Sequence, residues 1–425
     1  MEKYILNYIK ENSEDPIISK YIEYFKVELD WHFYNYGDNM SKKYLRAYKS
    51  TLTSKIQYIY KLLQSVSSRS IDNNSFKKVL TFLDIPKKSL FEAGISGYGS
   101  IFNPIGNFKS LGICQYKRLR RIINDIIYRF NFNQIVDNVS VFKYIDSHID
   151  VLCDYYSSYG ISGVFMNTDE YFINKYHLEI FKKINKPSFI FSHGLPGIYS
   201  KNVDNKSDYL LVWGEQIKLN YIKYGFDPNK IYVVGNPKYP LFPNKIKLRN
   251  TLKDVLVFTS SSVAWHQHEW FDFPIYDRSN IVLFLNSIMK VLKQNGVSHS
   301  RVRPHPSVNK NWLKKYIDPS FYTIDNKSLS DSLSSASIAI GPSSTTLLDS
   351  MVNGVNYIVY EPSEDGNKMN GNRCVPPFDG TEEYINVANS EEELDVLLRG
   401  KYQNDVRLLE KYMSPFDLKC IKKLL

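Results

Sequence analysis

The sequence predicts an α/β protein with two parallel, doubly wound sheets. Short apolar runs typical of buried strands recur along the chain, and segments with helical periodicity separate them. Residues 238–254 interrupt this alternation with two prolines and no clear period, and a second series of strands and helices begins at Val255. We therefore expect two Rossmann-like domains facing a central cleft. Their predicted limits are residues 1–240 and 250–400, and residues 401–425 are expected to form a C-terminal helix.

The first domain is expected to start with a mainly helical region, residues 1–80, because apolar residues recur there at helical spacing. The first predicted strand, 89–91, ends at Glu92 and leads into a loop with three glycines. Such a loop is typical of a ligand site, and a plain turn with a solvated glutamate is the alternative. Further strands are predicted at 163–167, 188–191, 209–212 and 231–234, and helices near 116–130 and 140–156.

The second domain is expected to begin with a strand at 255–258, followed by a helix near 281–294. Val302 continues a strand that Pro304 closes, and a strand at 337–340 ends at a Gly-Pro pair. The hydroxyl-rich residues 343–346 then precede a helix that Gly354 ends. A strand at 356–360 and helices near 391–398 and beyond residue 404 complete the prediction.

Polar side chains gather where these strands are expected to end. Residues 343–346 place four hydroxyls at a helix start, where N–H groups and a partial positive charge favour anions. Arg303 and His305 follow the strand closed by Pro304. Because the carboxyl ends of parallel strands share one edge, the sequence predicts a phosphate or nucleotide site there. An ordinary Ser/Thr helix cap is the alternative for residues 343–346.

The composition indicates a folded protein with 43% hydrophobic residues and a net charge of +10. This charge permits an anionic partner, such as an acidic glycan, a sugar nucleotide or the inner membrane surface. The basic residues form no concentrated stripe, so no nucleic-acid partner is expected. The densest cluster, residues 117–121, is typical of the exposed face of a helix.

The cysteines and the apolar segments indicate the compartment. The four cysteines are scattered without CxxC pairs, which fits a reducing cytoplasm and predicts no metal site. His266 and His268 lack an evident third ligand. The first residues are too charged for a signal peptide, and no apolar run reaches the ~20 residues of a membrane span. We expect a cytoplasmic protein, and peripheral contact with the inner face of the cell membrane stays open.

Three short motifs occur in a recognisable order, namely Glu92-Ala93-Gly94, His305-Pro306 and Ser343-Ser344. This order resembles bacterial sialyltransferases and polysialyltransferases of the two-Rossmann GT-B type, and capsule-assembly Kdo transferases are similar in parts. Those families carry an acidic-acidic-Gly motif, an HP motif and a Ser/Thr-rich motif. The resemblance extends over most of residues 85–365. This chain departs from the pattern at Ala93, where a second acid is usual.

The resemblance implies transfer of an ulosonic sugar, sialic acid or a relative such as Kdo, from a CMP donor. The acceptor would be a surface glycan or glycolipid of capsule or lipooligosaccharide type, and no metal or other cofactor would be obligatory. By position, Glu92 would deprotonate the acceptor hydroxyl, and His305 would contact the donor phosphate together with Ser343 and Ser344. The alternative bases are Asp169 and His193. The other residues expected near the donor are Thr259, Ser260, Arg303, Thr345 and Glu361.

Other activities stay open at this point. His193-Gly194 and Gly235-Asn236-Pro237 also resemble the CDP-glycerol glycerophosphotransferases of teichoic-acid assembly, which are GT-B proteins as well. An epimerase acting on a nucleotide sugar could share this fold. A non-catalytic glycan- or nucleotide-binding module is a further alternative, in which Ala93 marks a lost acid.

Overall fold

The structure is a computed structural model. It describes residues 11, 14–25, 60, 63–64, 68, 75–100, 108–112, 115–129, 139–199, 206–239, 246–260, 264–268, 271–275, 279–306, 308–364, 367–368 and 375–425.

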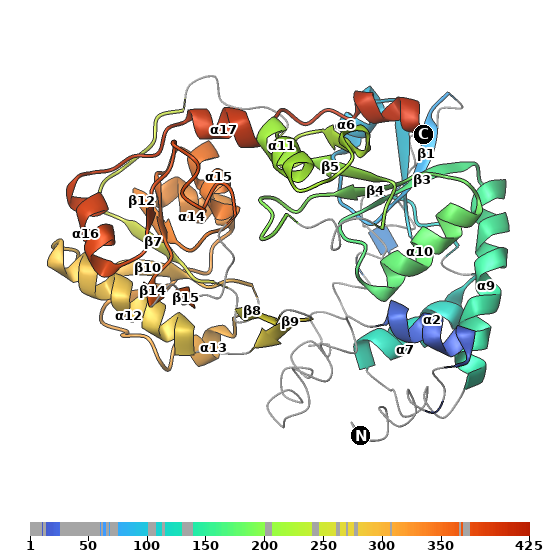
Figure 1. Ribbon diagram of the computed structural model, residues 1–425, viewed down its shortest axis with the longest axis horizontal. Helices are drawn as coiled ribbons and strands as arrows, with labels where there is room; N and C mark the ends of the chain where they lie inside the picture. Colours follow the sequence, from blue (N-terminus) through green and yellow to red (C-terminus); the bar gives the residue numbers. More distant parts are fainter. Residues whose placement is uncertain are drawn as a thin grey trace.

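The first domain is built on a six-stranded sheet with the order β2-β1-β3-β4-β5-β6, in which every neighbouring pair is parallel (Figure 1). Its strands are β1 (Lys77–Thr81), β2 (Ile95–Gly99), β3 (Ile161–Met166), β4 (Ser188–Phe191), β5 (Tyr209–Val212) and β6 (Ile231–Val233). Its helices are α2 (Pro16–Tyr24), α6 (Lys87–Glu92), α7 (Lys117–Arg129), α9 (Val139–Ser158), α10 (Phe172–Lys183), α11 (Glu215–Lys223) and the 3₁₀ turn η1 (Pro228–Lys230).

The second domain repeats this plan with a parallel sheet in the order β11-β10-β7-β12-β13-β16. Its strands are β7 (Val255–Phe258), β10 (Ser300–Arg303), β11 (Tyr322–Ile324), β12 (Ile338–Gly341), β13 (Tyr357–Tyr360) and β16 (Val387–Ala388). Its helices are α12 (Ser279–Gln294), α13 (Lys310–Leu313), α14 (Leu329–Ser335), α15 (Thr346–Val352) and α16 (Glu391–Arg399). Two antiparallel pairs lie outside the sheet, β8 (Ala264–His268) with β9 (Phe271–Ile275) and β14 (Ser363–Glu364) with β15 (Asn367–Lys368).

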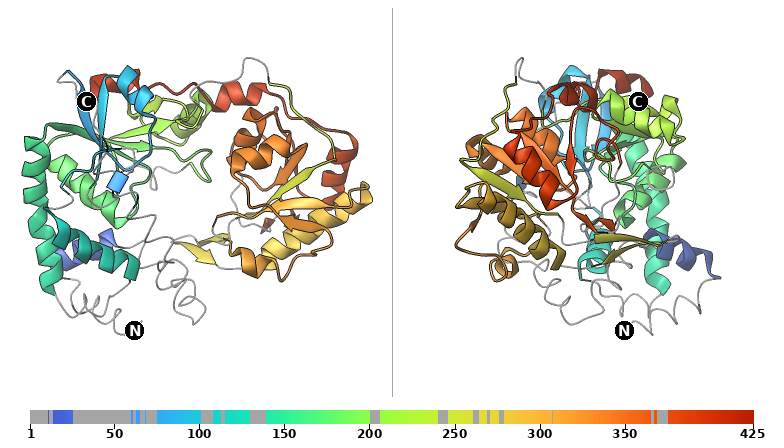
Figure 2. Two further views of the ribbon diagram at one scale, coloured as in Figure 1. Left: turned by 180° about the vertical axis from the view of Figure 1, so that it is seen from behind. Right: turned by 60° about the vertical axis from the view of Figure 1, so that its left-hand side comes forward.

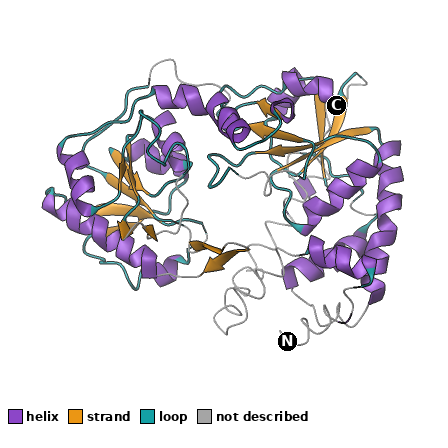
Figure 3. Ribbon diagram, in the orientation of Figure 1, coloured by secondary structure: helices purple, strands orange, loops and turns teal. Residues whose placement is uncertain are grey.

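Both faces of each sheet are covered, as Figure 3 shows. Alternate side chains of a strand point to opposite faces, so Val164 of β3 packs with α9 and α10 whereas Phe165 packs on the other side. The two domains also share one apolar cluster. In it, Val212 and Ile217 of the first domain pack with Leu347 of the second. This shared core holds the domains side by side.

The C-terminal segment returns to the first domain (Figure 2). The helix α17 (Arg407–Tyr412) packs against α11 and α15, and the 3₁₀ helix η2 (Lys419–Leu424) follows. Between these helices, the Ser414 N–H donates to the Trp213 carbonyl at 2.7 Å, and the Asp417 N–H donates to the Val234 carbonyl at 2.9 Å. The segment is therefore two short helices joined by a docked stretch, where the sequence predicted one helix.

The prediction of an α/β protein with two Rossmann-like domains is confirmed. Every strand predicted between residues 163 and 360 is present within a residue or two of its expected limits. Of the predicted helical region 1–80, α2 is helical and residues 77–80 lie in β1, and most of the rest lies outside the described residues. In the predicted linker, the Arg249 N–H pairs with the Gly354 carbonyl at 2.8 Å, so its last part belongs to the second domain.

One strand prediction is wrong. Residues 89–91 lie in α6, and the glycine-rich stretch that follows is strand β2. Gly97 is needed there for packing, because a Cβ atom at this position would lie 3.0 Å from Phe108 and 3.1 Å from Leu90. Gly97 therefore serves the packing of the core, where the sequence suggested a ligand loop.

Within the part of the chain that the structure describes, no helix is both long and apolar enough to cross a bilayer.

Candidate functional site

A cavity of about 330 Å³ lies between the two domains, where the carboxyl edges of the two sheets meet. The first domain contributes residues that follow β4, β5 and β6, and the second contributes the start of α15. The lining residues are His193, Trp213, Asn236, Lys238, Ser344, Thr345, Thr346 and Asp349. Parallel α/β sheets commonly bind ligands at this edge.

The wall from the first domain carries His193, two residues after the end of β4. The Ser192 hydroxyl donates to the Gly194 carbonyl at 2.8 Å, which closes the turn around this histidine. Partial burial lowers the pKa of His193 below its ordinary value. The imidazole is therefore neutral at pH 7 and can accept a proton.

The opposite wall is the loop between β12 and α15. The Ser344 and Thr346 hydroxyl oxygens lie 2.6 Å apart and share a hydrogen bond. Glu361, at the end of β13, is fully buried, and its carboxylate accepts the Ser343 N–H. Tyr357 donates its hydroxyl to the Pro342 carbonyl at 2.8 Å, so two buried side chains support the loop from below.

Glu361, which the sequence places near the donor, lies beneath the loop and not at the cavity surface. With 0% of its surface exposed, its carboxylate is a support for the loop and is not accessible to a ligand in this structure. The Ser343 hydroxyl is also buried, and it has no hydrogen-bond partner among the described residues.

Two contacts join the walls of the cavity. The Leu195 N–H donates to the Thr345 Oγ1 at 3.0 Å. One turn further along, Asp349 of α15 accepts hydrogen bonds from Lys238 Nζ at 3.0 Å and from the Tyr239 hydroxyl at 2.5 Å. The cavity is therefore bounded by polar contacts between the domains.

His305 lies on the same edge of the second sheet but is not among the residues that line the cavity. Its N–H donates to the Thr259 Oγ1 at 3.0 Å, and Thr259 donates to the Ser260 carbonyl at 3.0 Å. The strand β7 separates β10 from β12, so His305 is about two strand spacings, roughly 10 Å, from Ser343. Desolvation of the ring lowers the pKa of His305, so its imidazole is neutral at pH 7.

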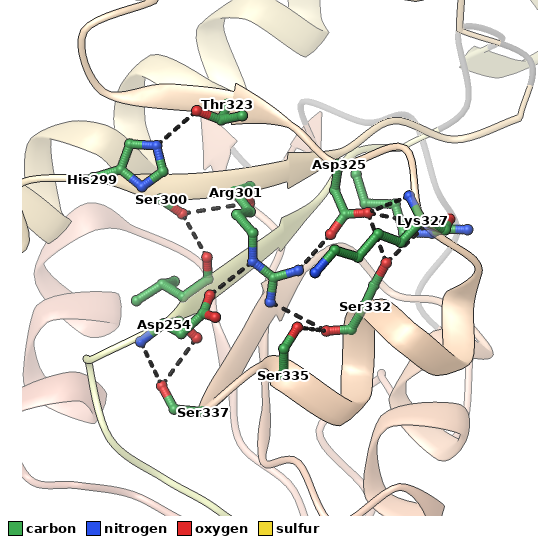
Figure 4. A network of polar contacts seen from close by, with 12 residues as sticks. Asp254, His299, Ser300, Arg301, Thr323, Asp325, Lys327, Ser332, Ser335 and Ser337 are labelled. Carbon is green, nitrogen blue, oxygen red and sulfur yellow. Dashed lines mark hydrogen bonds and ion pairs between the residues drawn. The ribbon is translucent and has the colours of Figure 1, made fainter.

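Arg303 belongs to a network on the sheet and not to the cavity. Its guanidinium donates to the Lys327 carbonyl at 2.7 Å and lies 3.5 Å from the carboxylate of Asp325. Figure 4 shows the neighbouring Arg301 between Asp254 and Asp325. Burial alone would raise the pKa of Asp325, but hydrogen bonds and the charge of Arg301 outweigh it and hold the pKa below its usual value. Arg303 is therefore held in a structural ion-pair network, and its contact with the donor stays a prediction.

Glu92 lies far from the cavity. It is the last residue of α6 and precedes β2, so it sits at the amino edge of the first sheet, whereas His193 follows the carboxyl edge. Its side chain is 54% exposed and lies 3.8 Å from the Nζ of Lys88. The structure does not bring the predicted acidic motif together with Ser343 and Ser344.

Asp169 lines a second cavity, of about 340 Å³, which also includes His193 and Glu170. Only 2% of Asp169 is exposed, and its Oδ2 accepts the Lys206 N–H at 3.0 Å. Burial raises the pKa of Asp169 and of Glu170. Both alternative bases named from the sequence thus lie at the carboxyl edge of the first sheet.

Three cavity residues were not predicted from the sequence, namely Trp213, Lys238 and Asp349. Asn236 was named only through the motif Gly235-Asn236-Pro237, which directly follows the predicted strand 231–234. Lys238 lies in the segment interpreted as a linker, and Asp349 lies within a predicted helix. Neither position carries a local signal for a site. The side chains of His266 and His268 lie outside the described residues.

No protein-family model matches the sequence, and no curated protein matches it. Among solved structures, the chain is similar to UDP-GlcNAc 2-epimerase from Methanocaldococcus jannaschii in complex with UDP-GlcNAc and UDP, with 12% identity over 82% of this chain and 97% of that chain, at a TM-score of 0.45. UDP-GlcNAc 2-epimerase from Neisseria meningitidis bound to UDP-GlcNAc shares 13% identity over 82% of this chain and 98% of that chain, at a TM-score of 0.42. The lipopolysaccharide outer core galactosyltransferase WaaB shares 10% identity over 82% of this chain and 97% of that chain, at a TM-score of 0.39. Identities this low transfer neither a ligand nor an activity to this chain.

Proposed function

We propose that this chain is a glycosyltransferase that uses a nucleotide-activated sugar, bound between its two domains. The observation that carries the proposal is that His193 on one wall of the cavity faces the same space as the hydroxyls of Ser344 and Thr346 on the other. Glycosyl transfer uses a base for the acceptor hydroxyl and hydrogen-bond donors for the leaving phosphate. The neutral imidazole and the hydroxyl groups can supply these two functions. They come from different domains.

In the proposed mechanism, His193 accepts the proton of the acceptor hydroxyl as its oxygen attacks the anomeric carbon of the donor. The bond from that carbon to the phosphate oxygen breaks, and the configuration inverts. Ser344, Thr346 and Lys238 donate hydrogen bonds to the departing phosphate, where negative charge develops. A positioned general base contributes about 10²- to 10⁴-fold to the rate.

For the donor, we favour a CMP-activated ulosonic sugar and a glycan or glycolipid acceptor at the inner face of the membrane, in line with the motif order of the sequence. His305 and Ser260 lie at the same edge as the Ser343 loop and are available to the nucleotide part of the donor. A nucleoside monophosphate is a good leaving group, so the proposal requires no metal. Addition of EDTA should therefore leave the transfer rate unchanged.

The test measures the thermal stability of the purified protein with CMP, CDP, UDP and GDP, and then transfer from the matching activated sugars. A ligand that binds only the folded state raises stability by RT ln(1 + [L]/Kd). We expect a selective shift with CMP that Ser344→Ala weakens, and transfer from a CMP-ulosonate. A protein that is stabilised by no nucleotide and transfers no sugar would contradict the proposal.

Variants of His193 and Glu92 decide which of the two residues is the general base. His193→Asn should lower kcat by about 10²- to 10⁴-fold with the donor KM kept. Glu92→Ala should leave kcat unchanged if His193 is the base, whereas a comparable loss in Glu92→Ala would restore the motif-based assignment. His148→Asn on α9 serves as the control for replacing a histidine outside the cavity.

One observation favours a second candidate, a CDP-glycerol-type glycerophosphotransferase. His193 and Asn236, which belong to the two motifs of that resemblance, line the same cavity. In this case CDP would stabilise the protein more than CMP does, and CDP-glycerol would be the donor. The nucleotide series above therefore separates the two candidates.

A further inference from the structure

The loop that carries His193 touches the second domain at a place where only glycine fits. A Cβ atom on Gly194 would lie 2.3 Å from the Oγ1 of Thr345 and 2.6 Å from its Cγ2. The φ of Gly194 is +152°, which side chains disfavour as well. The backbone next to His193 is thus pressed against a single side chain of the other domain.

The contact is also a directed hydrogen bond. The Leu195 N–H donates to the Thr345 Oγ1 at 3.0 Å, so His193 lies only two residues from a backbone group anchored to α15. On the same helix, Asp349 is four residues further and faces the same side. There it holds Lys238 and Tyr239 of the first domain. The start of α15 is therefore attached to the first domain at two points.

From these contacts we infer that Thr345 is a positioning residue that sets the place of the His193 imidazole relative to the donor site. The inference rests on the proposed function. Its physical basis is that the Thr345 Oγ1 accepts the Leu195 N–H, two residues from His193, in a hydrogen bond between the two domains. A base must lie within hydrogen-bonding reach of the acceptor hydroxyl. A shift of the loop that carries His193 therefore reduces the rate of transfer without weakening the binding of the sugar donor.

The experiment compares Thr345→Val, which keeps the shape and removes the acceptor oxygen, with Thr345→Ser, which keeps the oxygen. Thr323→Val, an exposed threonine on β11, is the matched control. We expect Thr345→Val to speed hydrogen exchange of the Leu195 amide by about tenfold and to shift the NMR titration of His193. It should lower kcat roughly five- to tenfold, as the loss of one hydrogen bond implies. Thr345→Ser should restore all three quantities, and the donor KM and the stabilisation by CMP should not change.

Unchanged exchange of the Leu195 amide in Thr345→Val would overturn the inference. So would a raised donor KM with kcat kept, because Thr345 would then be a donor ligand. If the wild-type protein transfers sugar from no donor, the proposed function fails. The exchange and the His193 titration would still decide whether Thr345 positions the loop.

Discussion

Replacing His177 by glutamine should remove a defined part of the pH dependence of stability. His177 is fully buried in the first domain, and burial lowers its pKa to about 4. Its Nδ1–H donates to the Ile173 carbonyl at 2.7 Å, so its Nε2 accepts the Tyr156 hydroxyl at 3.2 Å. The edge of Phe82 faces the ring at 4.8 Å between centroids. The site thus binds the neutral imidazole and disfavours a charged one.

The magnitude follows from the two pKa values. In the unfolded chain a histidine has a pKa of about 6.5, and each factor of ten in proton affinity is worth about 1.4 kcal/mol. Because the folded pKa is the lower one, the unfolded state binds more protons between pH 6.5 and 4. Stability is therefore full above pH 6.5 and is lost as the pH falls. The loss at pH 5 is about 2 kcal/mol, and it reaches about 3 kcal/mol below pH 4.

The assay is urea unfolding followed by circular dichroism at pH 7, 6 and 5. Hydrogen exchange of the α10 amides in parallel assigns the effect to the first domain. The wild-type protein should lose about 2 kcal/mol more than His177→Gln between pH 7 and pH 5. His299→Gln, an exposed histidine, should keep the wild-type dependence. Equal losses in the wild type and His177→Gln would refute the reasoning.

Three further substitutions test other parts of the structure. Gly235→Ala should lower Tm by more than Gly225→Ala does. Both glycines have positive φ, but only a Cβ on Gly235 would lie 2.3 Å from a carbonyl oxygen of the C-terminal segment. Equal shifts of Tm in the two variants would contradict this. Asp169→Asn should raise the free energy of unfolding at pH 7, because burial raises the pKa of Asp169 and wild-type stability falls as the pH rises above about 4. Urea unfolding with the same pH dependence in both proteins would count against it. Arg301→Met should lower the free energy of unfolding by roughly 3–5 kcal/mol, because it leaves the buried carboxylate of Asp325 poorly paired. The matched Arg407→Met, which breaks an exposed ion pair, should have a much smaller effect, and equal losses in urea unfolding would contradict the reasoning.

Four neighbouring strands of each sheet could be predicted because they are buried on both faces, whereas β1, β2, β11 and β16 were not predicted. Stretches such as 189–191 and 255–258 are continuous apolar runs between polar or glycine-containing ends, which is the pattern of a parallel sheet. The wrong strand prediction at 89–91 also comes from relying on short apolar runs. Three residues with an apolar majority suit a strand and one helical turn equally well, and only the tertiary contacts of Leu90 decide for the helix.

Of the candidate site, only the residues that directly follow a predicted strand could be predicted from the sequence. His193 and the Ser343 loop follow predicted strands, so the rule for carboxyl edges applies to them. Alternation along the strand places Arg303 on the same face as Arg301, but the sequence does not show that both side chains reach Asp325. The pairing of His193 with Thr345 depends on how two domains dock, and no local pattern encodes that.

The docking of residues 416–421 onto the first domain has a consequence for biosynthesis. Phe416, Leu418 and Ile421 complete an apolar cluster that includes Val79 and Phe165, more than 250 residues earlier in the chain. A ribosome releases the chain from its amino end, so the first sheet leaves the exit tunnel with part of one face uncovered. It stays so until the whole second domain has been translated. During that interval, chaperones that bind exposed apolar surface have their natural target on this face of the growing chain.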